Sequence, residues 1–178
     1  LTSLEYVGED LDLSNLKDSK GLDSLIYIGG IAYFSNLTSA QDLSSLKFIE
    51  GDAWFPSLVS TDGLESLEYI GDAANFERIT NATGLLSLEE IAGNAGFYRL
   101  FSANGLNTLK SIGGNAYFYT LADARGLESL ERIEGNALFD NLRSSDGLES
   151  LQKIGGKIKS RYVDFKQLLL KNNSHYHK

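Results

Sequence analysis

Cysteine and methionine are absent from the 178 residues of this sequence, which has only one proline and two histidines. Without cysteine, neither a disulfide scaffold nor a thiolate metal site can form. No window approaches the ~18 consecutive apolar residues of a membrane span, and the first ten residues lack the basic and apolar regions of a signal peptide. Because the sequence begins without methionine, we expect a fragment or a processed form of a longer protein.

Negative charge dominates, with a formal net charge of −8. Six of the 16 basic residues but only one of the 24 acidic residues, Asp164, lie in residues 157–178, which leaves residues 1–156 with a net charge of −13. This charge repels phosphates and argues against nucleic acid and anionic lipid as partners. Solubility is an alternative reason for the acidity. With 42% hydrophobic and 22% charged residues, we expect one domain with a sizeable core.

A 21-residue repeat runs through residues 1–156 without a slip in register. When Gly21 is position 1, position 2 is leucine in every full coil: Leu22, Leu43, Leu64, Leu85, Leu106, Leu127 and Leu148. Leucine also fills position 5, and isoleucine position 8. Position 12 is alanine from Ala32 to Ala137, and position 14 is phenylalanine from Phe34 to Phe139. Each coil must therefore bury its apolar face against its neighbours, which predicts a solenoid.

Positions 11 to 15 predict one β-strand in each coil. In residues 115–119, buried-type residues alternate with variable ones, as in a strand with one buried face. Strands of successive coils would pair in parallel at ~4.8 Å, so seven to eight coils would form a rod ~35 Å long. The predicted fold is therefore a leucine-rich-repeat-like, right-handed coil of short parallel strands with few or no long helices.

Glycine recurs at two positions and predicts two corners in each coil. Position 1 is glycine except at Asp42, and position 10 is glycine in most coils. We expect a positive φ at both positions, because glycine adopts it without steric cost. Aspartate at position 42 is expected to adopt the same conformation, which it tolerates better than most residues do.

The repeat ends after Gly156, so we assign residues 1–156 to the solenoid and residues 157–178 to a C-terminal cap with a frayed basic tail. Apolar residues at 162, 165, 168 and 169 have helical spacing, and Ser160 is the predicted N-cap. This short helix would cover the open end of the last coil. A linker to another domain is the alternative.

A family resemblance follows from the repeated phrase. Residues 105–118 read GLNTLKSIGGNAYF, a pattern that resembles the repeats of bacterial leucine-rich repeat surface proteins of the BspA-like type and of receptor L domains. The resemblance covers residues 1–156. It implies a parallel-strand solenoid used for adhesion or recognition, at the cell surface or secreted, and it supplies no catalytic residue.

Residues that could carry chemistry fall into repeated columns, which favours structural roles. Position 4 is serine or threonine in every coil, yet histidine, a common base for such nucleophiles, occurs only at His175 and His177. We expect the hydroxyls to bond turn backbone. Asp and Asn at position 11 lack the dense spacing of a calcium loop, so a ladder along the stack is favoured. The two histidines seldom suffice for a metal site. The sequence predicts no enzyme, metal or cofactor.

The outward side of the predicted strand carries the residues that we predict to bind a ligand: Tyr33, Trp54, Tyr98, Tyr117 and Tyr119. Alternation points them away from the core, and the missing side chain at Gly96 is expected to leave a dent beside the last three. Rings with polar tips anchor protein partners or stack on sugars. The competing interpretation is that aromatic residues simply favour strands.

A second aromatic column, at position 7, contains Tyr6, Tyr27, Phe48 and Tyr69 and becomes polar from Glu90 onward. It is either a local hydrophobic ladder or a ligand surface, and full burial of the rings would exclude the latter. The sequence therefore favours a noncatalytic recognition or adhesion module that binds a protein or a glycan on an exposed sheet face. A structural spacer or assembly segment of a larger surface protein is the alternative.

Overall fold

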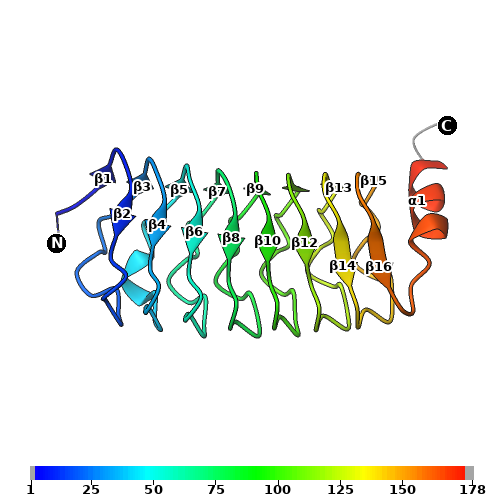
Figure 1. The fold of residues 1–178 in the computed structure, drawn as a ribbon, viewed down its shortest axis with the longest axis horizontal. Helices are drawn as coiled ribbons and strands as arrows, with labels where there is room; N and C mark the ends of the chain where they lie inside the picture. The colour runs from blue at the N-terminus through cyan, green and yellow to red at the C-terminus, as the bar shows by residue number, and fades with distance from the viewer. Residues whose placement is uncertain (1–2, 175–178) are drawn as a thin grey trace.

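The computed structural model describes residues 3–174 and shows a parallel β-solenoid, a rod of stacked coils (Figure 1). Two parallel sheets run along the rod. The first contains β1 (Tyr6–Val7), β3 (Tyr27–Ile28), β5 (Phe48–Ile49), β7 (Tyr69–Ile70), β9 (Glu90–Ile91), β11 (Ser111–Ile112), β13 (Arg132–Ile133) and β15 (Lys153–Ile154). The second contains β2 (Leu11–Asp12), β4 (Ala32–Tyr33), β6 (Ala53–Trp54), β8 (Ala74–Asn75), β10 (Ala95–Gly96), β12 (Ala116–Tyr117), β14 (Ala137–Phe139) and β16 (Ile158–Ser160).

Neighbouring strands pair at the interval of the repeat, as Ala95 does with Ala116 and Ile112 with Ile133. This register confirms the predicted 21-residue parallel solenoid. The prediction of a single strand over positions 11 to 15 was wrong, because most strands cover only positions 7–8 or 12–13. A strand of two residues is too short to show a period of two, so the first sheet left no alternating signal in the sequence.

The inward side chains form one continuous core. Six phenylalanines, from Phe34 to Phe139, stack with ring centroids 5.0–5.6 Å apart and interplanar angles of 2–11°. These rings are fully buried, and the alanines of position 12 beside them are at most 2% exposed. The small alanine leaves room for a ring in each layer, which keeps the packing dense. The predicted inward orientation of both columns is confirmed.

The C-terminal end of the rod is covered by the helix α1 (Phe165–Ser174) (Figure 1). Phe165 continues the ring stack at 5.3 Å from Phe139, and buried Asn172 donates hydrogen bonds to the carbonyls of Leu148 and Leu151 at 2.9 and 2.7 Å. The helix therefore satisfies both the apolar and the polar groups of the last coil. Among residues 3–174, no helix is long and apolar enough to cross a membrane.

The start of α1 differs from the prediction of an N-cap at Ser160. Asp164 is the N-cap, since its Oδ1 accepts the N–H of Gln167 at 3.1 Å. Ser160 ends β16 and accepts the N–H of Val163 in the turn before the helix. β16 thus extends the second sheet beyond residue 156. The tail at 175–178, with His175 and His177, lies outside the described residues.

The two glycine columns serve different purposes. At position 1, φ lies between 82° and 106° at Gly21, Gly63, Gly105, Gly126 and Gly147. The predicted positive φ was wrong at position 10, at Gly84 and at Asp42; Asp42 has a φ of −94°. At position 10 the coils approach closely instead. A Cβ on Gly114 would lie 2.6 Å from Asn94 Oδ1 and 2.8 Å from its backbone nitrogen.

Candidate ligand-binding face

Side chains at position 11 form a ladder along the rod. Asn94 Oδ1 accepts the N–H of Asn115 at 2.7 Å, Asn115 Oδ1 accepts that of Asn136 at 2.8 Å, and Asn136 Oδ1 accepts that of Lys157 at 2.7 Å. Asp10 and Asp52 make the same bond to the next coil. This confirms the predicted ladder. No three acidic or histidine side chains among residues 3–174 are grouped to hold a metal ion.

Hydroxyl groups at position 4 also bond backbone in the preceding coil. Ser45 donates to the carbonyl of Asp23, and Ser87 to that of Glu65, both at 2.7 Å. Thr108 donates to the carbonyl of Leu86 at 3.0 Å. The prediction that these hydroxyls bond turn backbone is confirmed at these three positions.

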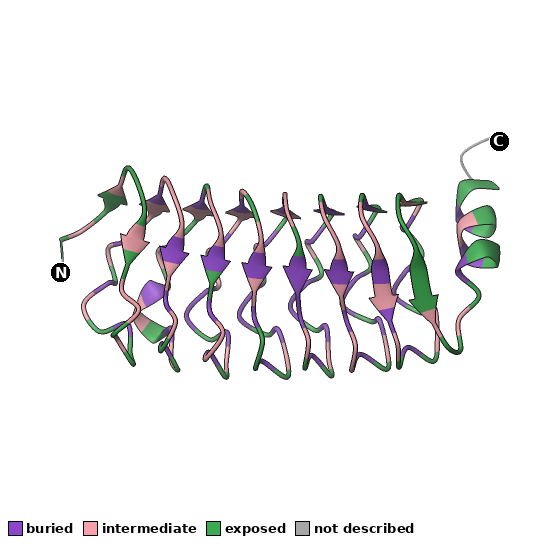
Figure 2. Cartoon of the chain, viewed as in Figure 1, coloured by how far each residue is buried: buried purple, intermediate pink, exposed green. Residues whose placement is uncertain are grey.

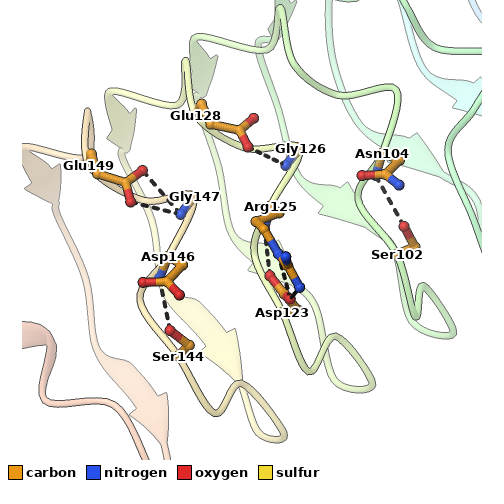
Figure 3. Close-up of polar contacts among 10 residues, drawn as sticks. All are labelled: Ser102, Asn104, Asp123, Arg125, Gly126, Glu128, Ser144, Asp146, Gly147 and Glu149. Carbon is orange, nitrogen blue, oxygen red and sulfur yellow. Dashed lines mark hydrogen bonds and ion pairs between the residues drawn. The ribbon is translucent and has the colours of Figure 1, made fainter.

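At the corner with the position 1 glycine, polar side chains of several coils bond their own turns (Figure 3). Glu128 accepts the N–H of Gly126 at 2.9 Å, and Glu149 accepts that of Gly147 at 3.0 Å. Directly before each of these glycines another bond recurs: Asp123 accepts the N–H of Arg125 at 3.0 Å, and Ser144 accepts that of Asp146 at 3.1 Å. These side chains replace backbone partners that a turn lacks.

A surface pocket of about 450 Å³ opens at this corner, lined by Phe101, Ser102, Asn104, Asp123 and Arg125. Ser102 accepts the N–H of Asn104 at 3.3 Å, and Asp123 pairs with Arg125. Hydrogen bonds from the Arg125 guanidinium and N–H hold the pKa of Asp123 below its ordinary value. The pocket therefore offers a ligand few polar groups that are not already bonded within the turn.

The outer face of the second sheet differs, because its side chains are not used by the coil backbone in a repeated pattern. Tyr98, Tyr117 and Tyr119, here called the tyrosine cluster, come from two adjacent coils. Tyr98 stacks on Tyr117 at 5.6 Å and 24° and on Tyr119 at 5.8 Å and 27°, while Tyr117 and Tyr119 are 6.0 Å apart. All three rings are partly exposed. The structure thus brings together three of the five predicted ligand-binding residues.

The dent predicted at Gly96 is filled. A Cβ at Gly96 would lie only 2.9 Å from Cε2 of Tyr98, so that ring lies over the glycine. The absence of a side chain at position 96 lets Tyr98 lean across its own coil and reach both rings of the next one. Gly96 therefore does not provide a cavity; it leaves the space in which the Tyr98 ring lies.

Tyr98 has a raised pKa, above its ordinary value of 10.0, because burial disfavours its ionised form and the neighbouring Tyr117, Tyr119 and Glu77 add repulsion. Because the phenol pKa is higher in the folded state, the free energy of unfolding is unaffected below pH 10 and falls as the pH rises through the folded-state pKa. We expect the free energy of unfolding to fall more steeply above pH 10 in the wild type than in Tyr98→Phe. Urea denaturation on either side of pH 10 measures this, and equal slopes would contradict it.

The other two predicted residues lie toward the N-terminal end of the same face. Tyr33 on β4 and Trp54 on β6 are paired in register, and Trp54 is 41% exposed. Asn75 on β8 and Gly96 on β10 separate them from Tyr117 in the sheet order. They extend the face but do not belong to the tyrosine cluster.

The aromatic column at position 7 lies on the first sheet. Tyr6 is 64% exposed, and Tyr27, Phe48 and Tyr69 are partly buried. Only Tyr6 and Tyr27 approach one another, at 6.3 Å. The rings are not fully buried, so burial does not exclude this column from ligand binding.

Sequence reasoning missed the cations that border the tyrosine cluster. Arg78 and Arg99 occupy position 16 in successive coils, and with Glu77 they line a depression of about 330 Å³. On the other side, Tyr117 lines a groove of about 450 Å³ with Asn136, Leu138, Lys157, Ile158 and Lys159. The signal available in the sequence was arginine at the same position of two consecutive coils.

Comparisons of this chain with protein-family models, with curated proteins and with solved structures found no match. The function is therefore inferred from the residues on the outer face of the second sheet.

Proposed function

We propose that this chain is a noncatalytic recognition or adhesion module that binds a protein or a glycan through the outer face of its second sheet. The observation that carries the proposal is the tyrosine cluster. Three partly exposed rings meet on a face where the neighbouring polar columns are already committed to coil structure. Tyrosine combines a large apolar ring with a polar tip, and such residues recur as anchors in binding surfaces.

Rigidity supports the same proposal. β10 and β12 each pair on both sides, so the cluster stands on a fully hydrogen-bonded part of the sheet. Beneath it lie the stacked rings of Phe97 and Phe118. A preformed surface loses little conformational entropy when it binds, which favours affinity from few contacts.

The resemblance of the repeat to BspA-like and receptor L-domain coils supports a bacterial protein that is secreted or displayed on the cell surface. A structural spacer or assembly segment is the second candidate. It is favoured by β1 and β2, which are the end strands of the two sheets in the described residues. Their free edges could take up further strands.

Replacing Tyr117 and Tyr119 together by serine is expected to abolish capture of the partner from surface extracts or from a glycan array. The fold should persist, because both side chains point away from the core and lie at partly exposed positions. The matched control replaces Tyr27 and Tyr69 by serine on the first sheet, which should leave capture unchanged. If the Tyr117 and Tyr119 variant captures as much as the wild type, the tyrosine cluster is not the binding surface and the spacer is favoured.

A further inference from the structure

We propose that the ligand is an acidic polysaccharide that lies along the rod across the tyrosine cluster. This inference rests on the proposed function and adds the chemical class of its ligand. It starts from the cations on both sides of the cluster. Arg99 directly follows Tyr98, and Arg78 occupies the same position one coil earlier; both are exposed. Together with Glu77 they line the depression described above, in which two guanidinium groups outweigh one carboxylate.

These arginines differ from several other cations on the rod, which form ion pairs: Lys47 lies 3.1 Å from Glu68, Lys110 lies 2.6 Å from Glu89, and Lys153 lies 2.5 Å from Glu134. Among residues 3–174, no carboxylate is within ion-pair distance of Arg78 or Arg99. Two adjacent, unneutralised guanidiniums on an otherwise acidic solenoid are well suited to an anionic ligand, which would bridge both.

The groove on the opposite side of the cluster has the same character. Lys159 is paired with Asp140 at 2.9 Å, but Lys157 has no ion-pair partner in the part of the chain that the structure describes. Both lysines flank Ile158 on β16, the exposed last strand of the second sheet (Figure 2). Leu138 and Ile158 give this groove apolar walls beside Tyr117.

Cations therefore lie before, within and beyond the coils of the tyrosine cluster. Arg78 is one coil before the cluster, Arg99 is in the coil of Tyr98, and Lys157 is two coils beyond Tyr119. Four steps between adjacent coils separate Arg78 from Lys157, and at about 4.8 Å per step they span roughly 19 Å. This arrangement fits an extended chain of sugar rings, in which some rings pack on tyrosine and their acidic groups meet the arginines or the lysine.

Two other macromolecules fit less well. A peptide that adds a strand needs a free sheet edge, yet β10 and β12 are paired on both sides. A nucleic acid carries phosphates at every nucleotide and requires a dense basic stripe, whereas residues 1–156 have a net charge of −13. A few separated cations beside rings instead suit a chain that offers sugar rings together with acidic groups.

Binding can be measured by titration calorimetry with four probes: oligogalacturonate, a heparin oligosaccharide, methyl-esterified oligogalacturonate and a neutral cello-oligosaccharide. We expect at least one of the two anionic probes to bind about ten-fold more tightly than both neutral ones. The carboxylate and sulfate arms tell which acidic group is recognised. Arg78→Gln with Arg99→Gln should weaken anionic binding about ten-fold, and Lys17→Gln with Lys20→Gln, which removes the same charge elsewhere, should not.

Three results would overturn the inference: binding of neither anionic probe, equal affinity for the neutral probes, or equal affinity for a tyrosine-free poly-glutamate peptide. Neutral sugar binding that is lost in the Tyr117 and Tyr119 double variant would leave the proposed function standing without the acidic ligand. If the Tyr117 and Tyr119 double variant still captures the partner from surface extracts, the proposed function is overturned instead. Circular dichroism spectra that match the wild type show that each variant is folded.

Discussion

Phe97→Ala is expected to lower the free energy of unfolding by about 3–5 kcal/mol, through lost burial and the cavity left behind. Phe97 is fully buried and lies between Phe76 at 5.6 Å and Phe118 at 5.4 Å. The neighbouring rings are held by the sheet register, so they cannot move along the axis to fill the space. A urea titration followed by circular dichroism measures the loss.

The chain provides a matched control at Phe101, which is 61% exposed on the corner of the same coil. Phe101→Ala removes the same atoms but should change stability by less than about 0.5 kcal/mol, as exposed substitutions generally do. If the two variants lose equal stability, the continuous stack of phenylalanines is not what holds adjacent coils together.

Gly105→Ala is expected to destabilise the rod strongly, for two reasons that act together. Gly105 has a φ of 106°, where an alanine costs about 1–3 kcal/mol. Its new Cβ would also lie 1.9 Å from the carbonyl oxygen of Ala82 in the preceding coil, and a backbone atom cannot turn aside as a side chain can. We expect a loss at or above the upper end of that range, measured by urea denaturation.

Gly8→Ala is the control for this substitution. No atom lies within 4 Å of the added Cβ, and Gly8 is not among the glycines with positive φ. Replacing it should leave stability unchanged or raise it slightly, because alanine restricts the unfolded chain. A similar loss in both variants would show that the strain at Gly105 does not limit stability.

Much of the fold could be predicted because the repeat tests each assignment several times. Alanine at position 12 and phenylalanine at position 14 recur in six coils, so one register satisfied all of them, and the structure buries every copy. The hydroxyl and amide columns were predicted for the same reason. A structural role common to all coils produces a residue type common to all coils.

What the sequence did not show depends on contacts between particular side chains. Gly96 indicates a missing side chain, but only the structure shows the Tyr98 ring occupying its space. Glycine at position 10 suggested an unusual φ, whereas the real constraint is the close approach of the preceding coil, as at Gly114. The same holds for the unpaired Arg78 and Arg99, since an absent partner leaves no mark in a single sequence.

In the described residues, strands pair only between adjacent coils, and this affects how fast the chain folds. Each pair in register, such as Ala95 with Ala116, joins residues separated by one repeat, which is roughly one eighth of the chain length. In all-β sandwiches and barrels the mean separation of contacting residues is larger, about 0.16–0.22 of the chain length, because they also pair strands that are far apart in sequence. Here every loop has the same modest closure entropy, so a nucleus can form at any pair of coils and grow in both directions. Growth toward the C-terminus then stops where Phe165 docks on Phe139.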